Sequence, residues 1–154
     1  MKTKILAILI PLVVLICVIV GVLLIIKPSK FYVEDKYYNT NGLVDVSKDE
    51  LESLLSEKKS FVLFAYSNVC MFSTPCETVF ASSSIAMGIN ILQIPLSEYK
   101  TTSLYNKVKY APTVIIIKNG RVVDYLDSNS DEDEALYQDN TAFENWIYTY
   151  IEAK

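Results

Sequence analysis

The sequence predicts an α/β domain that follows one N-terminal transmembrane helix. Three observations carry this prediction: an unbroken apolar N-terminal run, short apolar runs that alternate with helical patterns after it, and an Asn119-Gly120 pair between two strand-like runs. The 154 residues, less the membrane segment, suit one compact domain. We therefore expect a transmembrane anchor at 1–26, a linker at 27–42 and the domain at 43–154.

Residues 5–26 are apolar or small throughout, with lysines on both sides. As a helix this run is about 33 Å long, enough to cross the hydrocarbon core of a bilayer. A cleaved signal peptide is the alternative, but the run is longer than a usual signal and no small-residue cleavage site follows it. Cys17 is expected as a buried apolar thiol. We expect a single-pass cell-membrane protein whose domain lies on the extracytoplasmic side.

The first elements of the domain follow the linker. The aromatic residues of 27–42 are expected at the membrane interface, with a first edge strand as the alternative. Residues 43–46 form a short strand in this interpretation. Ser47 and Glu50 have the spacing of a capping box, which predicts a helix through about residue 58.

A buried strand and a helix enclose two cysteines. Residues 61–66 are apolar, aromatic and β-branched, which predicts the strand. Pro75 suits the first position of a helix that ends near Gly88. Cys70 and Cys76 lie in the turn between them. A helix N-terminus favours the thiolate, which is the form that attacks a disulfide.

The second half of the chain alternates in the same way. Residues 89–95 and 114–118 are expected as strands, with a weak helix at 101–109 between them. The Asn119-Gly120 pair predicts that 121–126 returns antiparallel. The acidic stretch 127–139 is expected as a solvated loop. A second capping box, Thr141 with Glu144, opens a final helix whose buried side is expected to hold Phe143, Trp146, Ile147, Tyr150 and Ile151.

This order of elements, with Pro75-Cys76 at a helix start and Ala111-Pro112-Thr113 before the hairpin, resembles the thioredoxin-like superfamily. The resemblance covers about 43–154. It implies a central mixed sheet flanked by helices. It also implies that Pro112 is cis and lies against the cysteine pair, and that Ala111 offers its backbone to a bound peptide.

The cysteine spacing departs from the usual Cys-x-x-Cys of that family. Here it is Cys-x5-Cys. Counted from the strand, Cys70 falls within a residue of the attacking cysteine and the turn has grown. Counted back from the helix, Ser73 replaces that cysteine and the nucleophile is lost. Leu63 also stands where many thioredoxins have a buried acid that helps proton transfer.

A disulfide between Cys70 and Cys76 requires a loop between them. Residues six apart in a continuous helix rise about 9 Å and face different directions, which is outside disulfide range. By family position Cys70 would be the exposed attacker and Cys76 the resolving thiol. Met71 and Phe72 are expected to form an apolar docking patch for the substrate beside them.

Composition excludes several other functions. The net charge is −4, and beyond residue 26 the chain has 12 basic and 18 acidic residues, which argues against nucleic-acid binding. Histidine is absent, so catalysis by histidine and metal binding by histidine are both excluded. The acidic run at 131–134 lacks the spacing of a calcium loop. We expect no metal and no cofactor.

The sequence therefore predicts a membrane-anchored thiol-disulfide oxidoreductase that acts on protein thiols and disulfides through Cys70 and Cys76. The alternative is a redox-inactive thioredoxin-like module that binds a partner protein at the membrane. A monomer is expected in either case.

Overall fold

The computed structural model describes residues 29–38, 42–67 and 75–154. Within these ranges five strands form one sheet in the order β1-β3-β2-β4-β5. The strands are β1 (Leu43–Asp45), β2 (Phe61–Tyr66), β3 (Ile91–Pro95), β4 (Thr113–Lys118) and β5 (Arg121–Tyr125). The first three run parallel, and β4 and β5 each run antiparallel to their neighbour, so the sheet is mixed as expected.

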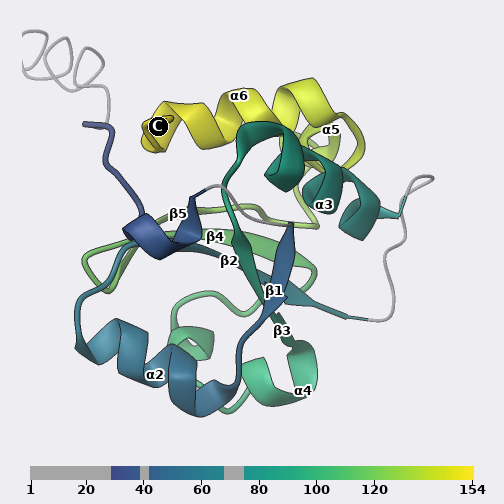
Figure 1. Ribbon diagram of the computed structural model, residues 1–154. Coiled ribbons are helices and arrows are strands. Elements are labelled where there is room, and N and C mark those ends of the chain that lie inside the picture. The colour runs from purple at the N-terminus through teal and green to yellow at the C-terminus, as the bar shows by residue number, and fades with distance from the viewer. Residues whose placement is uncertain (1–28, 39–41, 68–74) are drawn as a thin grey trace, which may run out of the picture.

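Helices cover both faces of the sheet. On one face lie α3 (Cys76–Met87), α5 (Glu134–Gln138) and α6 (Asn140–Tyr150), and on the other lie α2 (Lys48–Ser56) and α4 (Leu96–Tyr99) (Figure 1). Two 3₁₀ helices, η1 (Asp35–Tyr37) and η2 (Ser103–Asn106), complete the elements of the described residues. The architecture is an α/β sandwich of three layers.

The central strands are buried because both of their faces are covered. Residues 61–65 of β2 and 114–117 of β4 are at most 1% exposed, and all are apolar. Continuous apolar runs are typical of strands with helices on both sides. The sequence run that predicted β2 at 61–66 therefore matches the structure at both ends.

Local signals set several boundaries correctly. The Ser47 side chain accepts a hydrogen bond from the Glu50 amide and the Glu50 carboxylate accepts one from the Ser47 amide, so the predicted capping box is present. Gly88 ends α3 in the left-handed conformation, with φ of 65°. The Asn119-Gly120 turn joins β4 to β5, as the hairpin prediction required.

Two predictions in the second half need correction. The acidic stretch expected as a loop contains α5, because Leu136 and Tyr137 pack into the core. The final helix is capped by Asp139, whose carboxylate accepts a hydrogen bond of 2.7 Å from the Ala142 amide, and Thr141 lies inside the helix. The sequence prediction also missed α4, which follows β3 directly.

Residues 29–38 belong to the folded unit, which corrects this part of the expected linker. The Phe31 amide donates to the Tyr150 carbonyl at 2.8 Å, and the Glu152 amide donates to the Phe31 carbonyl at 2.9 Å. The side chains of Phe31, Val33, Tyr37 and Tyr38 are all buried. Phe31, Tyr37 and Tyr38 therefore belong to the domain core, whereas Tyr32 is 58% exposed.

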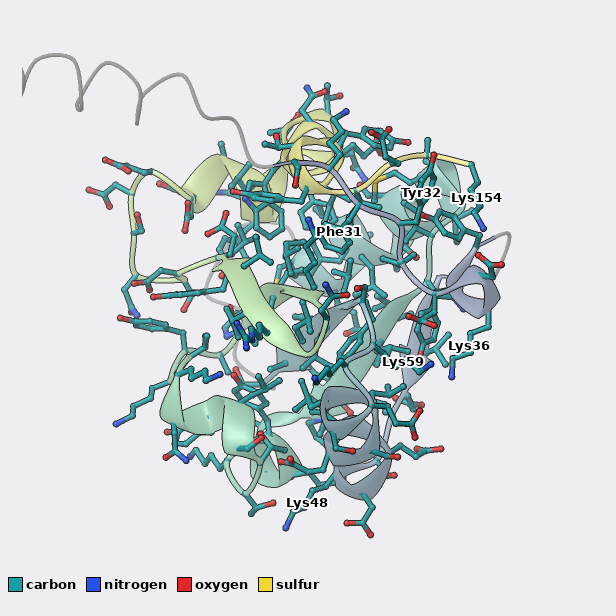
Figure 2. All side chains as sticks on the ribbon, turned by 90° about the vertical axis from the view of Figure 1, so that its left-hand side faces the viewer. Phe31, Tyr32, Lys36, Lys48, Lys59 and Lys154 are labelled. Atoms are coloured by element: carbon teal, nitrogen blue, oxygen red, sulfur yellow. The ribbon has the colours of Figure 1, made fainter. Side chains whose placement is uncertain are left out.

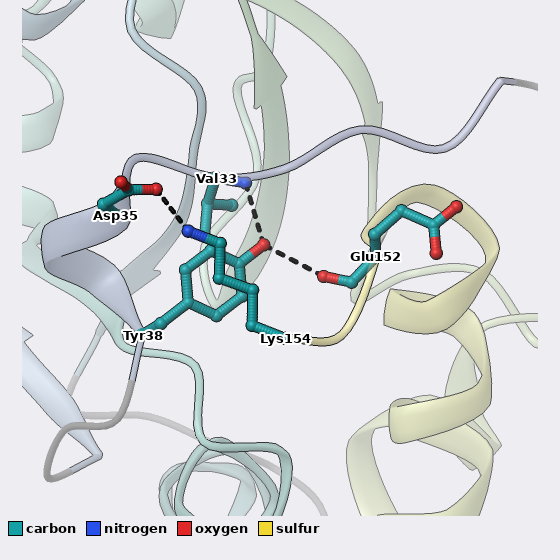
Figure 3. Close-up of polar contacts among 5 residues, drawn as sticks. All are labelled: Val33, Asp35, Tyr38, Glu152 and Lys154. Atoms are coloured by element: carbon teal, nitrogen blue, oxygen red, sulfur yellow. Dashed lines mark hydrogen bonds and ion pairs between the residues drawn. The ribbon is translucent and has the colours of Figure 1, made fainter.

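A polar cluster fastens the same segment to the C-terminus (Figure 3). The Tyr38 hydroxyl accepts a hydrogen bond of 3.2 Å from the Val33 amide and donates one of 2.9 Å to the Glu152 carbonyl. Lys154 pairs with Asp35, and its ammonium lies 4.8 Å from the centre of the Tyr38 ring. The two ends of the described chain are thus held together.

The expected anchor, 1–26, lies outside the described residues. Among the helices that the structure does describe, none has the length and apolar character needed to cross a bilayer.

Candidate functional site

The candidate site lies at the end of the sheet where β2 and β3 finish. Tyr66 is the last residue of β2 and pairs with Pro95, the last residue of β3. Ser67 follows, and the described chain resumes at Pro75. Three predicted site residues, Cys70, Met71 and Phe72, lie outside the described residues.

Cys76 is the first residue of α3 and is only 2% exposed. Pro75 occupies the N-cap position, one residue before the place predicted for it, and its carbonyl accepts the Thr78 amide at 2.9 Å. The helix therefore begins directly at the cysteine. This places Cys76 at a helix N-terminus, where the backbone amides and the helix dipole favour a thiolate.

Pro112 lies beside the end of β2. The Ala111–Pro112 peptide bond is cis, as the resemblance implied. Thr113, the next residue, pairs with Ala65 of β2. The Thr113 hydroxyl donates to the Leu126 carbonyl at 2.6 Å, which holds the start of β4 against the end of β5. Pro112 is thus brought to the same end of the sheet as the cysteine turn.

Tyr137 joins Pro112 to the helix that carries Cys76. Its hydroxyl donates a hydrogen bond of 2.9 Å to the Pro112 carbonyl, and its ring lies 5.7 Å from that of Phe80 in α3. Tyr137 is fully buried. Sequence reasoning missed this residue because it lies in a stretch interpreted as a solvated loop. The adjacent apolar pair Leu136-Tyr137 was the signal that could have identified it.

Ala111 is half-buried and precedes β4. Its neighbour Tyr110 stacks on Tyr125, with ring centres 5.9 Å apart and planes 19° apart. The charge of Asp127 close by raises the pKa of the Tyr110 hydroxyl. Ala111 is therefore flanked by a stacked aromatic pair on one side and by buried Pro112 on the other.

A hollow opens at the ends of β2 and β3, next to where the cysteine turn starts. Its lining comes from Tyr66, Ser67, Pro95, Leu96, Ser97 and Lys100. Leu63, farther back on β2, is fully buried and pairs with Leu92 and Ile115. The position where many thioredoxins have a buried acid is thus enclosed by apolar neighbours in the sheet.

No cluster of three or more histidine, cysteine or carboxylate side chains is placed to hold a metal ion within the described ranges.

Comparisons with known proteins establish the fold. No model of a known family matches the chain, and no curated protein matches it. A mutant thioredoxin from Halobacterium salinarum is similar in structure, with a TM-score of 0.54 and 19% sequence identity, over 74% of this chain and 95% of that one. Two further thioredoxins are also similar to this chain.

The oxidised thioredoxin from Plasmodium falciparum matches with a TM-score of 0.51 and 17% identity, over 69% of this chain and 95% of its own. The Schistosoma mansoni thioredoxin matches with a TM-score of 0.50 and 23% identity, over 72% of this chain and 97% of its own. Identities this low carry information about the fold alone. The chain therefore has the thioredoxin-like fold that its sequence resembles.

Proposed function

We propose that the protein is a membrane-anchored thiol-disulfide oxidoreductase that acts on protein thiols and disulfides through Cys70 and Cys76. The observation that carries the proposal is the position of Cys76, buried at the start of α3, at the same end of the sheet as cis Pro112. Cys70 belongs to the segment 68–74, which connects β2 to this helix in the sequence. A thioredoxin-like fold is compatible with thiol-disulfide exchange but does not by itself imply it, so the proposed reaction depends on these residues.

The reaction proceeds by two thiolate displacements. The Cys70 thiolate attacks one sulfur of a substrate disulfide, the substrate S–S bond breaks, and one substrate thiolate leaves. The Cys76 thiolate then attacks the Cys70 sulfur and releases the second substrate thiolate. The substrate gains two electrons, the protein acquires a Cys70–Cys76 disulfide, and the leaving thiolates take up protons from water. The reverse sequence oxidises a substrate dithiol.

The burial of Cys76 bears on its role. Cys76 is 2% exposed, so a bulky protein substrate cannot reach its sulfur directly. An intramolecular attack on Cys70 requires no such access. The burial of Cys76 supports it as the resolving thiol, and the resemblance assigns the attack on the substrate to Cys70.

The substrate polypeptide binds beside the cysteines in this proposal. Ala111 precedes β4 and can pair through its backbone with an extended substrate segment, as an added strand. Met71 and Phe72 supply apolar contact. The apolar run 5–26 anchors the domain on the extracytoplasmic side of the cell membrane. Disulfides form and persist in an oxidising environment of this kind, so a protein dithiol can exchange with them there.

One observation favours the second candidate, a redox-inactive module that binds a partner. Leu63 is fully buried among apolar residues, so the site has no acid at that position to assist proton transfer. In this alternative the cysteines can be replaced without loss of function, whereas changes at Ala111, Met71 or Phe72 reduce partner binding.

A thiol titration of the full-length protein in detergent distinguishes the two candidates. The protein is equilibrated across a series of glutathione redox buffers, and its accessible and total thiols are counted by mass after alkylation. Cys70→Ser and Cys76→Ser are the test variants, and Cys17→Ser is the matched control because Cys17 lies in the apolar run.

For an oxidoreductase, two thiols disappear together in a reversible two-electron transition in the wild type and in Cys17→Ser. Cys70→Ser abolishes exchange with a protein substrate, and Cys76→Ser accumulates the mixed disulfide on Cys70. Thiols that stay reduced in oxidising buffer, or a bond that glutathione cannot reduce, would overturn the redox proposal in favour of the binding module.

A further inference from the structure

The first described residues lie at the end of the sheet where β2 begins, and we call this the entry end of the domain. The first described residue, Ser29, accepts two hydrogen bonds of 3.2 Å from the Lys118 ammonium, through its carbonyl and its hydroxyl. Lys118 is the last residue of β4, and its neighbour Ile117 pairs with Phe61, the first residue of β2. Ser29 therefore lies at the end of the sheet where β2 begins.

The cysteine turn lies at the opposite end. It follows Tyr66, the last of the six residues of β2. A strand of six residues is about 17–20 Å long, so roughly this distance separates the entry of the chain from the start of the turn. Figure 1 shows the same separation: the segment that precedes η1 lies on one side of the molecule, and the end of β2 and the start of α3 lie on the other.

The segment that connects the apolar run to the domain is short. Residues 29–38 are fastened by the backbone hydrogen bonds of Phe31 and by the Tyr38 cluster. The apolar run ends at residue 26, so only Lys27 and Pro28 precede Ser29. Two residues span at most about 7 Å. An anchor in the bilayer therefore holds the entry end of the domain close to the headgroups.

The charge at the entry end suits an anionic surface, although the whole chain has a net charge of −4. We define the entry end as residues 29–38, 57–60, 118–121 and 151–154. Its basic residues are Lys30, Lys36, Lys58, Lys59, Lys118, Arg121 and Lys154, against the acidic Glu34, Asp35, Glu57 and Glu152. Lysines and exposed aromatic rings are the side chains typical of the headgroup region.

Figure 2 views the molecule from this side and shows Lys36, Lys59 and Lys154 on it together with Tyr32. The Tyr32 ring is 58% exposed and has the Lys154 ammonium 5.9 Å from its centre. One stretch at the opposite end is strongly acidic. Residues 127–134, which follow β5 at the cysteine end, include five acidic residues, Asp127, Asp131, Glu132, Asp133 and Glu134, and no basic one.

We propose that the entry end lies on the surface of an anionic bilayer and that the cysteine end points away from it. The domain is then oriented by its own packing and by its charge, and does not rotate freely on a tether. The substrates are proteins that present a thiol or disulfide about 17–20 Å from the headgroups, one strand length above the membrane. This inference rests on the membrane anchoring in the proposed function.

The test uses the unmutated full-length protein in anionic nanodiscs that contain a small fraction of lipid with an amine-reactive headgroup. Mass spectrometry identifies the lysines that become attached to lipid. Lys118 is the decisive residue, because it is far from the apolar run in sequence and reaches the bilayer only through the packing of residues 29–38. We expect labelling at Lys118 at least several-fold above that at Lys100, which lies beside Tyr66 and Ser67 at the cysteine end.

Equal labelling of Lys118 and Lys100, or a preference for Lys100, would overturn the orientation. A charge variant tests the electrostatic part: Lys36→Glu should lower the labelling of Lys118, and the matched control Lys100→Glu at the cysteine end should not. Unchanged labelling in Lys36→Glu would overturn the role of the charged surface.

The thiol titration gives the same result in either orientation, so failure of this inference and failure of the redox proposal are distinguishable. A chain that does not incorporate into nanodiscs would overturn both the orientation and the membrane anchor, and would leave the thiol chemistry to its own experiment.

Discussion

The hydroxyl of Tyr137 donates a hydrogen bond of 2.9 Å to the carbonyl oxygen of Pro112. Both residues are buried, and the Tyr137 ring also contacts Phe80 of α3. The short helix α5 therefore connects the two backbone segments that border the candidate site. In our proposal Tyr137 is a positioning residue, because it acts through Pro112 and does not touch the reacting sulfurs.

Tyr137→Phe should destabilise the protein by about 1–2 kcal/mol, because the change leaves the buried Pro112 carbonyl without this donor. Guanidinium unfolding of the full-length protein, followed by the fluorescence of Trp146, measures the loss. Tyr32→Phe is the matched control: the same hydroxyl is removed from a ring that is 58% exposed, so its effect should stay within about 0.5 kcal/mol. Equal effects for the two variants would contradict the assigned hydrogen bond.

Asn140→Ala should loosen the contact between α3 and α6. The Asn140 side-chain amide donates to the Val79 carbonyl at 3.1 Å and to the hydroxyls of Ser82 and Ser83 at 2.7 and 2.8 Å. We expect a loss of about 1–2 kcal/mol in unfolding free energy. Asn145→Ala makes the same chemical change at another exposed position of the same helix and should cost far less, because the hydrogen bonds to α3 come from Asn140. Similar costs would show that the amide does not join the helices.

Gly120→Ala should be more destabilising than Gly88→Ala. Both glycines have a left-handed backbone, with φ of 70° and 65°, so alanine is strained by about 1–2 kcal/mol at either position. Only at Gly120 would the added Cβ lie 2.4 Å from the Leu55 carbonyl oxygen, whereas Gly88 has open space. Overpacking should add about 1–3 kcal/mol at Gly120. Denaturant midpoints of the two variants measure the difference, and equal midpoints would refute the close approach of this turn to α2.

Tyr150 should make stability sensitive to alkaline pH. Burial raises the pKa of its hydroxyl above the usual value of 10.0, and the hydrogen bond to Asp124 and the charge of that carboxylate raise it further. The oxygen of Asp124 accepts this bond at 2.7 Å and a second one from Trp146 at 3.0 Å. The folded state therefore binds the Tyr150 proton more tightly than the unfolded state does.

It follows that the contribution of Tyr150 to stability is fully present below pH 10 and is lost as the pH rises from there towards the folded-state pKa. Denaturant midpoints between about pH 8 and pH 11 should fall more steeply in the wild type than in Tyr150→Phe. Tyr99, whose pKa is also raised by burial, titrates in both proteins and cancels in the comparison. Parallel curves would show that Tyr150 ionises alike in the folded and unfolded states.

Elements with strong local signals could be predicted from the sequence. The β2 run at 61–66, the Ser47 and Glu50 capping box and the Asn119-Gly120 turn each depend on neighbours within a few residues, and all three are present in the structure. The cis peptide bond before Pro112 was also predicted, because the order of these elements resembles the thioredoxin-like superfamily. The two cysteines were recognised by their position in a strand-to-helix turn, and their chemistry stays a prediction.

Elements that depend on distant partners were predicted wrongly or missed. Residues 29–38 looked like an interfacial linker because their aromatic residues follow an apolar run, but Tyr150, Glu152 and Lys154 hold them on the domain. The acidic stretch looked solvated because charge dominates its composition, yet Tyr137 is buried within it.

The sequence by itself determined the order of the five strands and of helices α2, α3 and α6, the apolar centre of the sheet and the place of the cysteines in the chain, because each follows from hydrophobic period and turn chemistry over short spans. Only the tertiary structure decided which ends of the sheet hold the chain entry and the site, and that Tyr137 supports Pro112. Those relationships join residues 25 to 114 positions apart, and only the packing of the folded chain brings such residues together.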